Sequence, residues 1–179
     1  RLWATWYAGG VNEGPLNFAV LVTSDDGGEN WSEPVAVVDP PGNERAYDPT
    51  LWIGPDGVLR WFWAQTYSPE DGVISNGVDG VWFAACSDAE SPSPEWDDPI
   101  RIANGVMMNK PVVLSGGDWA FPTAVWASNL GGATAPEELE CECFSNITLS
   151  HDQGKSYELR IGPDIPDRCF DEHHIVELK

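Results

Sequence analysis

The sequence is poor in basic side chains. It has 9 Lys and Arg residues against 29 Asp and Glu residues, which gives a formal net charge of −20 at pH 7. Binding to nucleic acid or to an anionic membrane surface needs clustered Lys and Arg, so we expect neither partner. The chain also lacks an apolar run of the roughly 18 to 20 residues that crosses a bilayer, and it has no signal-peptide pattern.

Metal-binding cysteine patterns are missing as well. The four cysteines are Cys86, Cys141, Cys143 and Cys169, and the Cys-x-Cys spacing at 141 to 143 is not that of a zinc site. We therefore expect no metal and no cofactor. In an exported protein these cysteines could form disulfides. The sequence leaves the location unknown, with an extracellular or periplasmic one favoured.

Helical periodicity is absent, whereas turn-forming and aromatic residues are abundant. The 179 residues include 10 Trp, 18 Gly and 15 Pro, and 42% of them are hydrophobic. Short aromatic strands joined by many turns have this composition, and the chain is long enough to bury a core. The sequence therefore predicts an all-β protein.

A short motif recurs along the chain. SDDGGENW at 24–31 and SHDQGKSY at 150–157 both read Ser-x-Asp-x-Gly-x-x followed by an aromatic residue. CSDAESPSPEWDDP, which starts at Cys86, is a degenerate copy that keeps Ser87 and Trp96. The serines at 24, 87 and 150 are spaced 63 residues apart. A fixed period of this size is typical of a repeat architecture.

The sequence between the motifs repeats too. PTLWIGPDGVLRWFWAQ at 49–65 aligns with PVVLSGGDWAFPTAVWA at 111–127, as a strand, a turn and an aromatic strand. Two further strands flank each serine motif, so each unit has four short strands, as in one blade of a β-propeller. We predict blades at about 1–38, 49–103 and 111–162, then the first strand of another blade up to 179.

The motif itself is predicted to be structural. Its Ser and Asp oxygens can accept backbone N–H bonds, its glycine can take a positive φ, and its aromatic ring can pack beside the turn. We expect it to act as a clamp between the third and fourth strands of a unit. The residues concerned are Ser24, Asp26, Gly28 and Trp31, and Ser150, Asp152, Gly154 and Tyr157.

The motif and its spacing resemble the Asp-box, or bacterial neuraminidase repeat, of sialidase-like glycosidases. The resemblance implies a six-bladed propeller whose boxes lie away from the active-site face. About three blades would then be an incomplete arc, with flanking blades of the parent chain as its neighbours. A fold does not by itself establish an activity.

Charged residues recur where the first strand of each unit is predicted to start. Asp48, Lys110 and Glu172 are spaced 62 residues apart. Because the first strand is the innermost strand of a propeller blade, we expect these side chains around the central mouth. They form either a structural ion-pair network or part of a functional site.

Two further segments resemble sialidase active-site segments. DEHHIVEL at 171–178 resembles one in which a glutamate partners a tyrosine nucleophile, and Glu172 holds the matching position. AGGVNEGPLNF at 8–18 occupies the place of the family's aspartate general acid/base and offers Glu13 instead. The resemblance therefore implies Glu13, Glu172 and Asp48 as candidate catalytic carboxyls.

The same face offers candidate substrate contacts, because an arginine can bind an anionic or hydroxyl-rich substrate through its planar fork. One hypothesis is a sialidase-like glycoside hydrolase that acts on a carbohydrate as the full-length protein. The alternative is a non-catalytic propeller that binds carbohydrate or protein through the same mouth. The candidate contacts are Arg45, Asn109, Lys110, Trp126, Arg168, Asp171 and His173.

Overall fold

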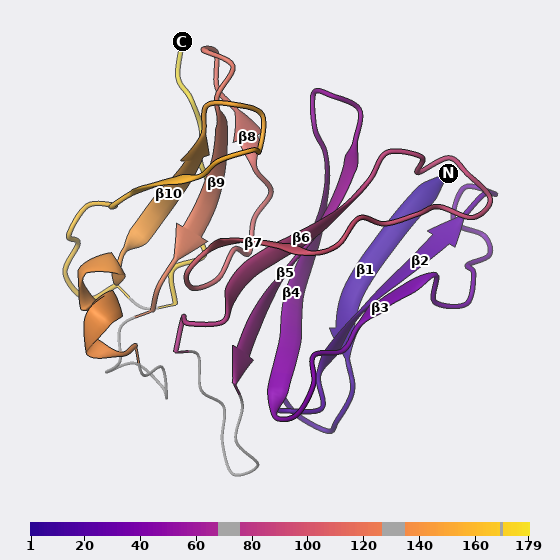
Figure 1. The fold of residues 1–179 in the computed structure, drawn as a ribbon, viewed down its shortest axis with the longest axis horizontal. Coiled ribbons are helices and arrows are strands. Elements are labelled where there is room, and N and C mark those ends of the chain that lie inside the picture. The colour runs from indigo at the N-terminus through magenta and orange to yellow at the C-terminus, as the bar shows by residue number, and fades with distance from the viewer. Residues whose placement is uncertain (68–75, 127–134, 169) are drawn as a thin grey trace.

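Figure 1 shows a computed structural model of the chain, which describes residues 1–67, 76–126, 135–168 and 170–179. These residues form three antiparallel sheets, which confirms the predicted all-β class. The strands are β1 (Leu2–Ala8), β2 (Phe18–Ser24), β3 (Ala36–Val38), β4 (Glu44–Ile53), β5 (Leu59–Tyr67), β6 (Gly80–Cys86), β7 (Ile100–Ala103), β8 (Val112–Val113), β9 (Trp119–Ala124), β10 (Ser145–Ser150) and β11 (Glu158–Arg160), and a 3-10 helix, η1, spans Glu137–Glu142.

Each sheet is a meander in which strands that follow one another in sequence are paired in space. The first sheet is β1-β2-β3, the second is β4-β5-β6-β7 and the third is β8-β9-β10-β11. The sheets lie side by side, with the second between the other two (Figure 1). The second sheet begins at Glu44, before the predicted Pro49.

The central strand β5 explains why the second sheet lies in the middle. Trp61 and Trp63 pack with Leu21 of the first sheet. Phe62, between them in sequence, points to the other side and packs with Phe121 of the third sheet. Successive strand residues face opposite sides, so a run of large apolar residues predicts a strand buried on both faces. Each such side chain contributes roughly 1.5–3 kcal/mol through burial.

The strand β1 corresponds to β5 and β9, the second strands of the other sheets. Leu2, Leu59 and Trp119 each pair with the last residue of the following strand, at Ser24, Cys86 and Ser150. In the described part of the chain, β1 pairs with β2 alone. Two of its hydrophobic side chains, Leu2 and Trp6, are 46% exposed.

The C-terminal residues 173–179, predicted as a first strand, belong to no strand in the structure. Asn109 Nδ2 donates to the carbonyl oxygens of Glu172 at 2.9 Å and His173 at 3.2 Å, and the Ser115 amide donates to Glu177 at 2.6 Å. Each of these hydrogen bonds involves a side chain, whereas a β-strand needs hydrogen bonds between main chains.

Each turn that contains the serine motif begins where a strand ends. These strands are β6 and β10, each the third strand of its sheet, and β2, the equivalent strand of the first sheet. We call these turns the first box (24–31), the second box (86–96) and the third box (150–157). In the first box, Ser24 Oγ donates to Asp26 at 2.7 Å and accepts the Gly28 amide at 2.9 Å. Asp26 also accepts the Asn30 amide at 2.9 Å. These bonds hold the pKa of Asp26 at about 2, chiefly through the Asn30 amide.

The third box repeats this geometry. Ser150 Oγ donates to Asp152 at 2.9 Å and accepts the Gly154 amide at 2.7 Å, while Asp152 accepts the Ser156 amide at 2.8 Å. The Tyr157 hydroxyl donates to the Gly154 carbonyl at 2.8 Å. In the first box, Gly28 instead lies beside the ring of Trp31. Both glycines have a positive φ, as the turn requires.

The second box places a cysteine where the others have serine. Cys86 Sγ donates to Asp88 at 3.2 Å, and Asp88 accepts the Glu95 amide at 3.1 Å, just before Trp96. Cys86 is buried, whereas Ser87, predicted as the box serine, is exposed. The residue equivalent to Ser24 and Ser150 is therefore Cys86, one position before the serine that the constant spacing of 63 residues predicts. Cys86 is the last residue of β6, and its thiol faces the turn.

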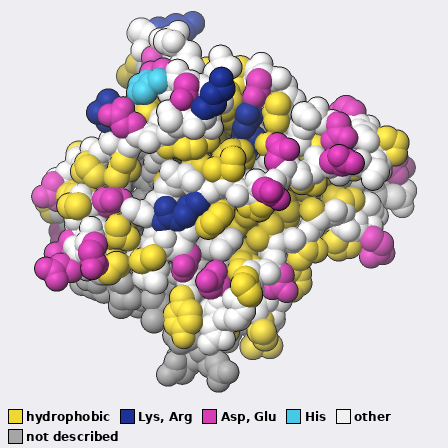
Figure 2. Space-filling view, viewed as in Figure 1, with side chains coloured by type: hydrophobic (Ala, Val, Ile, Leu, Met, Phe, Trp, Pro, Cys, Tyr) yellow, Lys and Arg dark blue, Asp and Glu magenta, His cyan; other side chains and the backbone are white. Residues whose placement is uncertain are grey.

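Acidic side chains are spread over the visible face of the molecule, with exposed hydrophobic side chains between them (Figure 2). Among the described residues, no helix has the length and apolar character needed to cross a membrane.

Replacing a box serine and, separately, Ser87 tests whether Ser87 holds the second box together as Ser150 holds the third. We expect Ser150→Ala to lower the free energy of unfolding by about 1–3 kcal/mol, because it leaves the Gly154 amide without its acceptor. Ser87→Ala, at an exposed position, should change it by no more than about 0.5 kcal/mol. Urea unfolding of the complete protein measures both. Equal losses in the two variants would restore Ser87 as the box residue.

Candidate functional site

A pocket of about 320 Å³ lies at the ends of the strands that are remote from the boxes. Tyr7, for example, lies toward the opposite end of β1 from Leu2, the residue that pairs with Ser24. Segments from all three sheets and from the C-terminal region contribute to the wall. The lining residues are Tyr7, Glu13, Arg45, Tyr47, Asp48, Thr66, Met108, Trp126, Phe170 and Glu172.

Arg45 forms a buried positive charge in this wall. Its residue surface is 1% exposed, and its guanidinium lies 4.3 Å from the ring centre of Tyr47 and 5.7 Å from that of Tyr7. Its Nη1 forms an ion pair with Glu13 at 3.3 Å. Aromatic faces and a carboxylate both stabilise a guanidinium that has lost its water. In the described structure Arg45 Nε has no hydrogen-bond partner.

Glu13 is held at the pocket by two groups. One carboxylate oxygen accepts the Tyr7 hydroxyl at 3.2 Å, and the other accepts Arg45 Nη1 at 3.3 Å. Burial, and then the nearby charge of Glu13, raise the pKa of Tyr7. Glu13 is therefore a carboxylate with a fixed partner on each oxygen.

Asp48 lies at an interruption in β4. The pairing of β4 with β5 shifts register between Tyr47 and Thr50, and Asp48 has a φ of 46°. A left-handed conformation is uncommon for a residue with a side chain, and the following Pro49 adds a further restriction. Such local strain costs on the order of 1–3 kcal/mol and occurs preferentially at functional sites.

The surroundings of Asp48 favour its protonated form. Burial raises the pKa of Asp48 to about 6, and the charges of Glu13 and Glu172 act in the same direction, while Arg45 opposes them. A carboxyl that holds its proton up to this pH can act as a general acid. The pocket thus combines a carboxyl whose pKa is raised to about 6 with a second carboxyl group that is bonded to Arg45 and Tyr7.

The structure separates the three predicted strand-start charges. Asp48 and Glu172 line the pocket, whereas Lys110 is exposed and does not line it. Their equal spacing in sequence conceals different local structures. Asp48 lies within a long strand, Lys110 precedes the two-residue strand β8, and Glu172 lies outside the strands.

The other predicted contacts anchor the C-terminal region instead of lining the pocket. Arg168 pairs with Asp171 at 2.8 Å and lies over the ring of Phe144. His173 Nε2 lies 2.7 Å from the carbonyl oxygen of Asn146. Asn109 binds the backbone of this segment, as described above. Of the predicted contacts, Trp126 and Arg45 line the pocket.

Sequence reasoning named no role for five residues of the wall, which are Tyr7, Tyr47, Thr66, Met108 and Phe170. Tyr7 carried a signal, because it lies on a strand with two tryptophans, β1, just before the loop of Glu13. Phe170 carried none, since its ring meets Trp126 edge-on at 5.2 Å through a contact between segments distant in sequence.

The described residues contain no group of three or more His, Cys, Asp or Glu side chains suited to a metal ion. Cys86, Cys141 and Cys143 are free thiols, and Cys169 lies outside the described residues.

No protein-family model matches the chain, and no curated protein matches it either.

Asp48→Asn tests the protonation of Asp48. A carboxyl whose pKa rises on folding stabilises the folded chain below its ordinary value of 3.8 and loses that contribution as the pH rises through about 6. Asparagine also tolerates the left-handed conformation and stays uncharged. At pH 8 we expect the variant to be more stable than the wild type by on the order of 1–3 kcal/mol.

The gain should disappear near pH 4, where the wild-type carboxyl is protonated in the folded chain. Thermal unfolding of the complete protein at both pH values measures the difference. The same change at pH 4 and pH 8 would assign the effect to altered contacts and not to the proton.

Proposed function

We propose that the protein is a glycoside hydrolase with a sialidase-like propeller fold and that the pocket around Asp48 is its catalytic site. The sheets described above are arranged as three successive blades of such a propeller would be, with β1–β3 lacking one strand. Flanking blades of the parent chain would complete the ring. The boxes support the fold, and the pocket at the opposite strand ends supports the activity.

One observation carries the proposal: two carboxyl groups in one pocket have contrasting environments. Hydrolysis of a glycosidic bond uses two carboxyl groups that flank the bond. One is protonated and gives its proton to the leaving oxygen, and the other is a carboxylate. Burial favours the proton on Asp48, while Arg45 and Tyr7 hold the carboxylate of Glu13. We therefore assign the general acid to Asp48 and the second carboxylate to Glu13.

The assignment differs from the one that the family resemblance implies, in which Glu13 is the acid/base. Glu13 accepts a hydrogen bond on each of its oxygens, from Tyr7 and from Arg45, so its carboxyl group is held in place. Asp48 has the desolvated environment that a proton donor requires. Glu172 lines the same pocket and adds negative charge beside Asp48.

The charges of the pocket favour a neutral sugar. Arg45 is ion-paired with Glu13, and Arg168, the other arginine considered for substrate binding, is ion-paired with Asp171. If a sugar carboxylate took over one of these arginines, Glu13 or Asp171 would lose its ion-pair partner.

Activity measurements on the complete protein test this proposal. The assay is glycoside release from a panel of neutral aryl glycosides, sialosides and acidic polysaccharides. Asp48→Asn and Glu13→Gln should each lower kcat by about 10²- to 10⁴-fold, the usual contribution of acid–base catalysis. Glu33→Gln, at an exposed position on the box side of the first sheet, is the matched control and should retain full activity.

The pH profile adds a readout that a structural role would not change. Because the acid must be protonated, kcat/KM of the wild type should fall as the pH rises through about 6. The neutral glycosides should also be better substrates than the sialosides. Absence of turnover on every substrate, with glycan binding intact in all variants, would replace the hydrolase with the non-catalytic carbohydrate-binding protein.

A further inference from the structure

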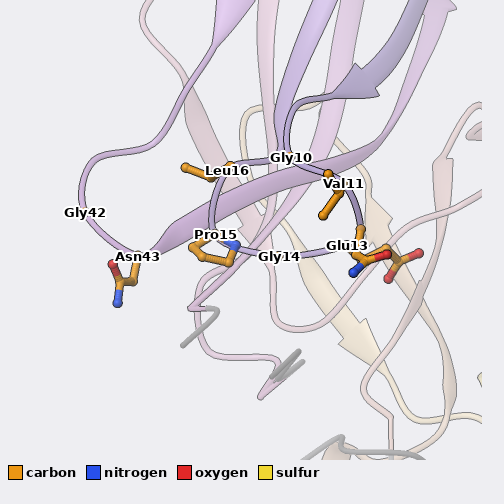
Figure 3. Close-up of a pocket in the computed structure, with 9 residues that line it drawn as sticks. Gly10, Val11, Glu13, Gly14, Pro15, Leu16, Gly42 and Asn43 are labelled. Carbon is orange, nitrogen blue, oxygen red and sulfur yellow. The ribbon is translucent and has the colours of Figure 1, made fainter. Parts of the chain in front are cut away.

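A second hollow, of about 430 Å³, lies beside the catalytic pocket. The loop at 10–16 forms most of its wall, and Gly42 and Asn43 close it (Figure 3). Glu13 lines both this hollow and the catalytic pocket. In Figure 3, Glu13 and Asn43 lie toward opposite ends of the hollow. The two spaces therefore meet at the carboxylate that we place in the reaction.

A buried asparagine shapes the loop. Asn17 is 2% exposed, and its Nδ2 donates to the carbonyl oxygens of Gly9 at 2.7 Å and Asn12 at 3.1 Å. Its Oδ1 accepts the Gly14 amide at 2.9 Å. The Ala46 amide of β4 donates to the Asn17 carbonyl at 3.1 Å. The loop is thus tied internally and to the strand that carries Arg45 and Asp48, so the hollow exists before any ligand binds.

The lining chemistry suits an uncharged, hydroxyl-rich ligand with apolar faces. Of the 9 described residues in the lining, Glu13 alone is charged, and it is paired with Arg45. Asn12 and Asn43 offer amide donors and acceptors. Val11 is 98% exposed and Leu16 is 68% exposed, so both offer apolar surface that a bound ligand can cover. Binding sites for small ligands combine apolar surface with a few polar groups in this way.

We propose that the hollow is a second carbohydrate subsite, which holds the neutral sugar next to the one bound in the catalytic pocket. The bond between the two sugars then passes Glu13, the residue common to both spaces. This inference rests on the proposed function, and it makes the substrate an oligosaccharide of neutral sugars.

Gly14 allows the hollow to be filled without strain on the backbone. A Cβ placed there meets nothing within 4 Å, and the residue has no positive φ. We therefore choose Gly14→Trp as the blocking variant. Gly116→Trp is the matched control, because Gly116 has the same open surroundings and ordinary φ but lies in the β8–β9 turn. Asn43→Ala, which removes an exposed amide from the hollow, is a second and milder variant.

Binding is measured in the complete protein with Asp48→Asn as the background, so that hydrolysis does not interfere. The probes are cellotriose, maltotriose, xylotriose and β-1,4-galactotriose, each compared with its monosaccharide by calorimetry or by saturation-transfer NMR. We expect at least one trisaccharide to bind tenfold or more tightly than its monosaccharide. Gly14→Trp should abolish that advantage, Asn43→Ala should reduce it several-fold, and Gly116→Trp should preserve it.

Two results would overturn the subsite: no trisaccharide binds more tightly than its monosaccharide, or Gly14→Trp leaves the advantage intact while its thermal unfolding matches that of Gly116→Trp. The outcome is independent of catalysis. A trisaccharide advantage that Gly14→Trp removes, in a wild type that releases no sugar, would support the subsite and refute the hydrolase.

Discussion

The hydrogen bonds between the box side chains and the turn backbone are the constraint on which the remaining structure depends. Ser24, Cys86 and Ser150 each end a strand and bond to an aspartate two residues later, and that aspartate accepts an amide just before the aromatic residue. In every sheet the residue at this position is the last one paired with the preceding strand, so the box marks the end of that pairing. Glu13 and Asp48 lie toward the opposite strand ends, in one pocket.

Within that pocket, burial and pairing act on two carboxyls in opposite ways. Asp48 is desolvated and sits near further negative charges, so the proton is favoured there. Glu13 is more exposed, with a side chain that is 60% accessible, yet it holds an almost fully buried guanidinium. One loop residue thereby neutralises Arg45, shares its carboxylate with Tyr7 and increases the tendency of Asp48 to stay protonated. The strained backbone at Asp48 persists because β4 and β5 pair on both sides of it.

The sequence was sufficient to predict features set by local chemistry. The all-β class followed from composition, and the aromatic strand predicted within 49–65 is the central strand β5, in which Trp61, Phe62 and Trp63 are buried. Prediction failed where equal spacing was taken as equal structure. The second box uses the thiol of Cys86 and not the hydroxyl of Ser87, and Lys110 does not join Asp48 and Glu172. The left-handed φ of Asp48 and the contact of Phe170 with Trp126 depend on tertiary packing, which no local pattern encodes.

The second box also differs in length, and this difference reaches beyond the box itself. Asp88 accepts the amide of a residue seven positions later, whereas Asp26 and Asp152 accept one from four positions later. The three additional residues leave both the carboxylate–amide bond and the pairing of β6 with β5 in place. The longer turn of the second box thus does not change the pairing of the strand before it. New sequence for anchoring or display can therefore be inserted here while the pocket at the opposite strand ends keeps its geometry.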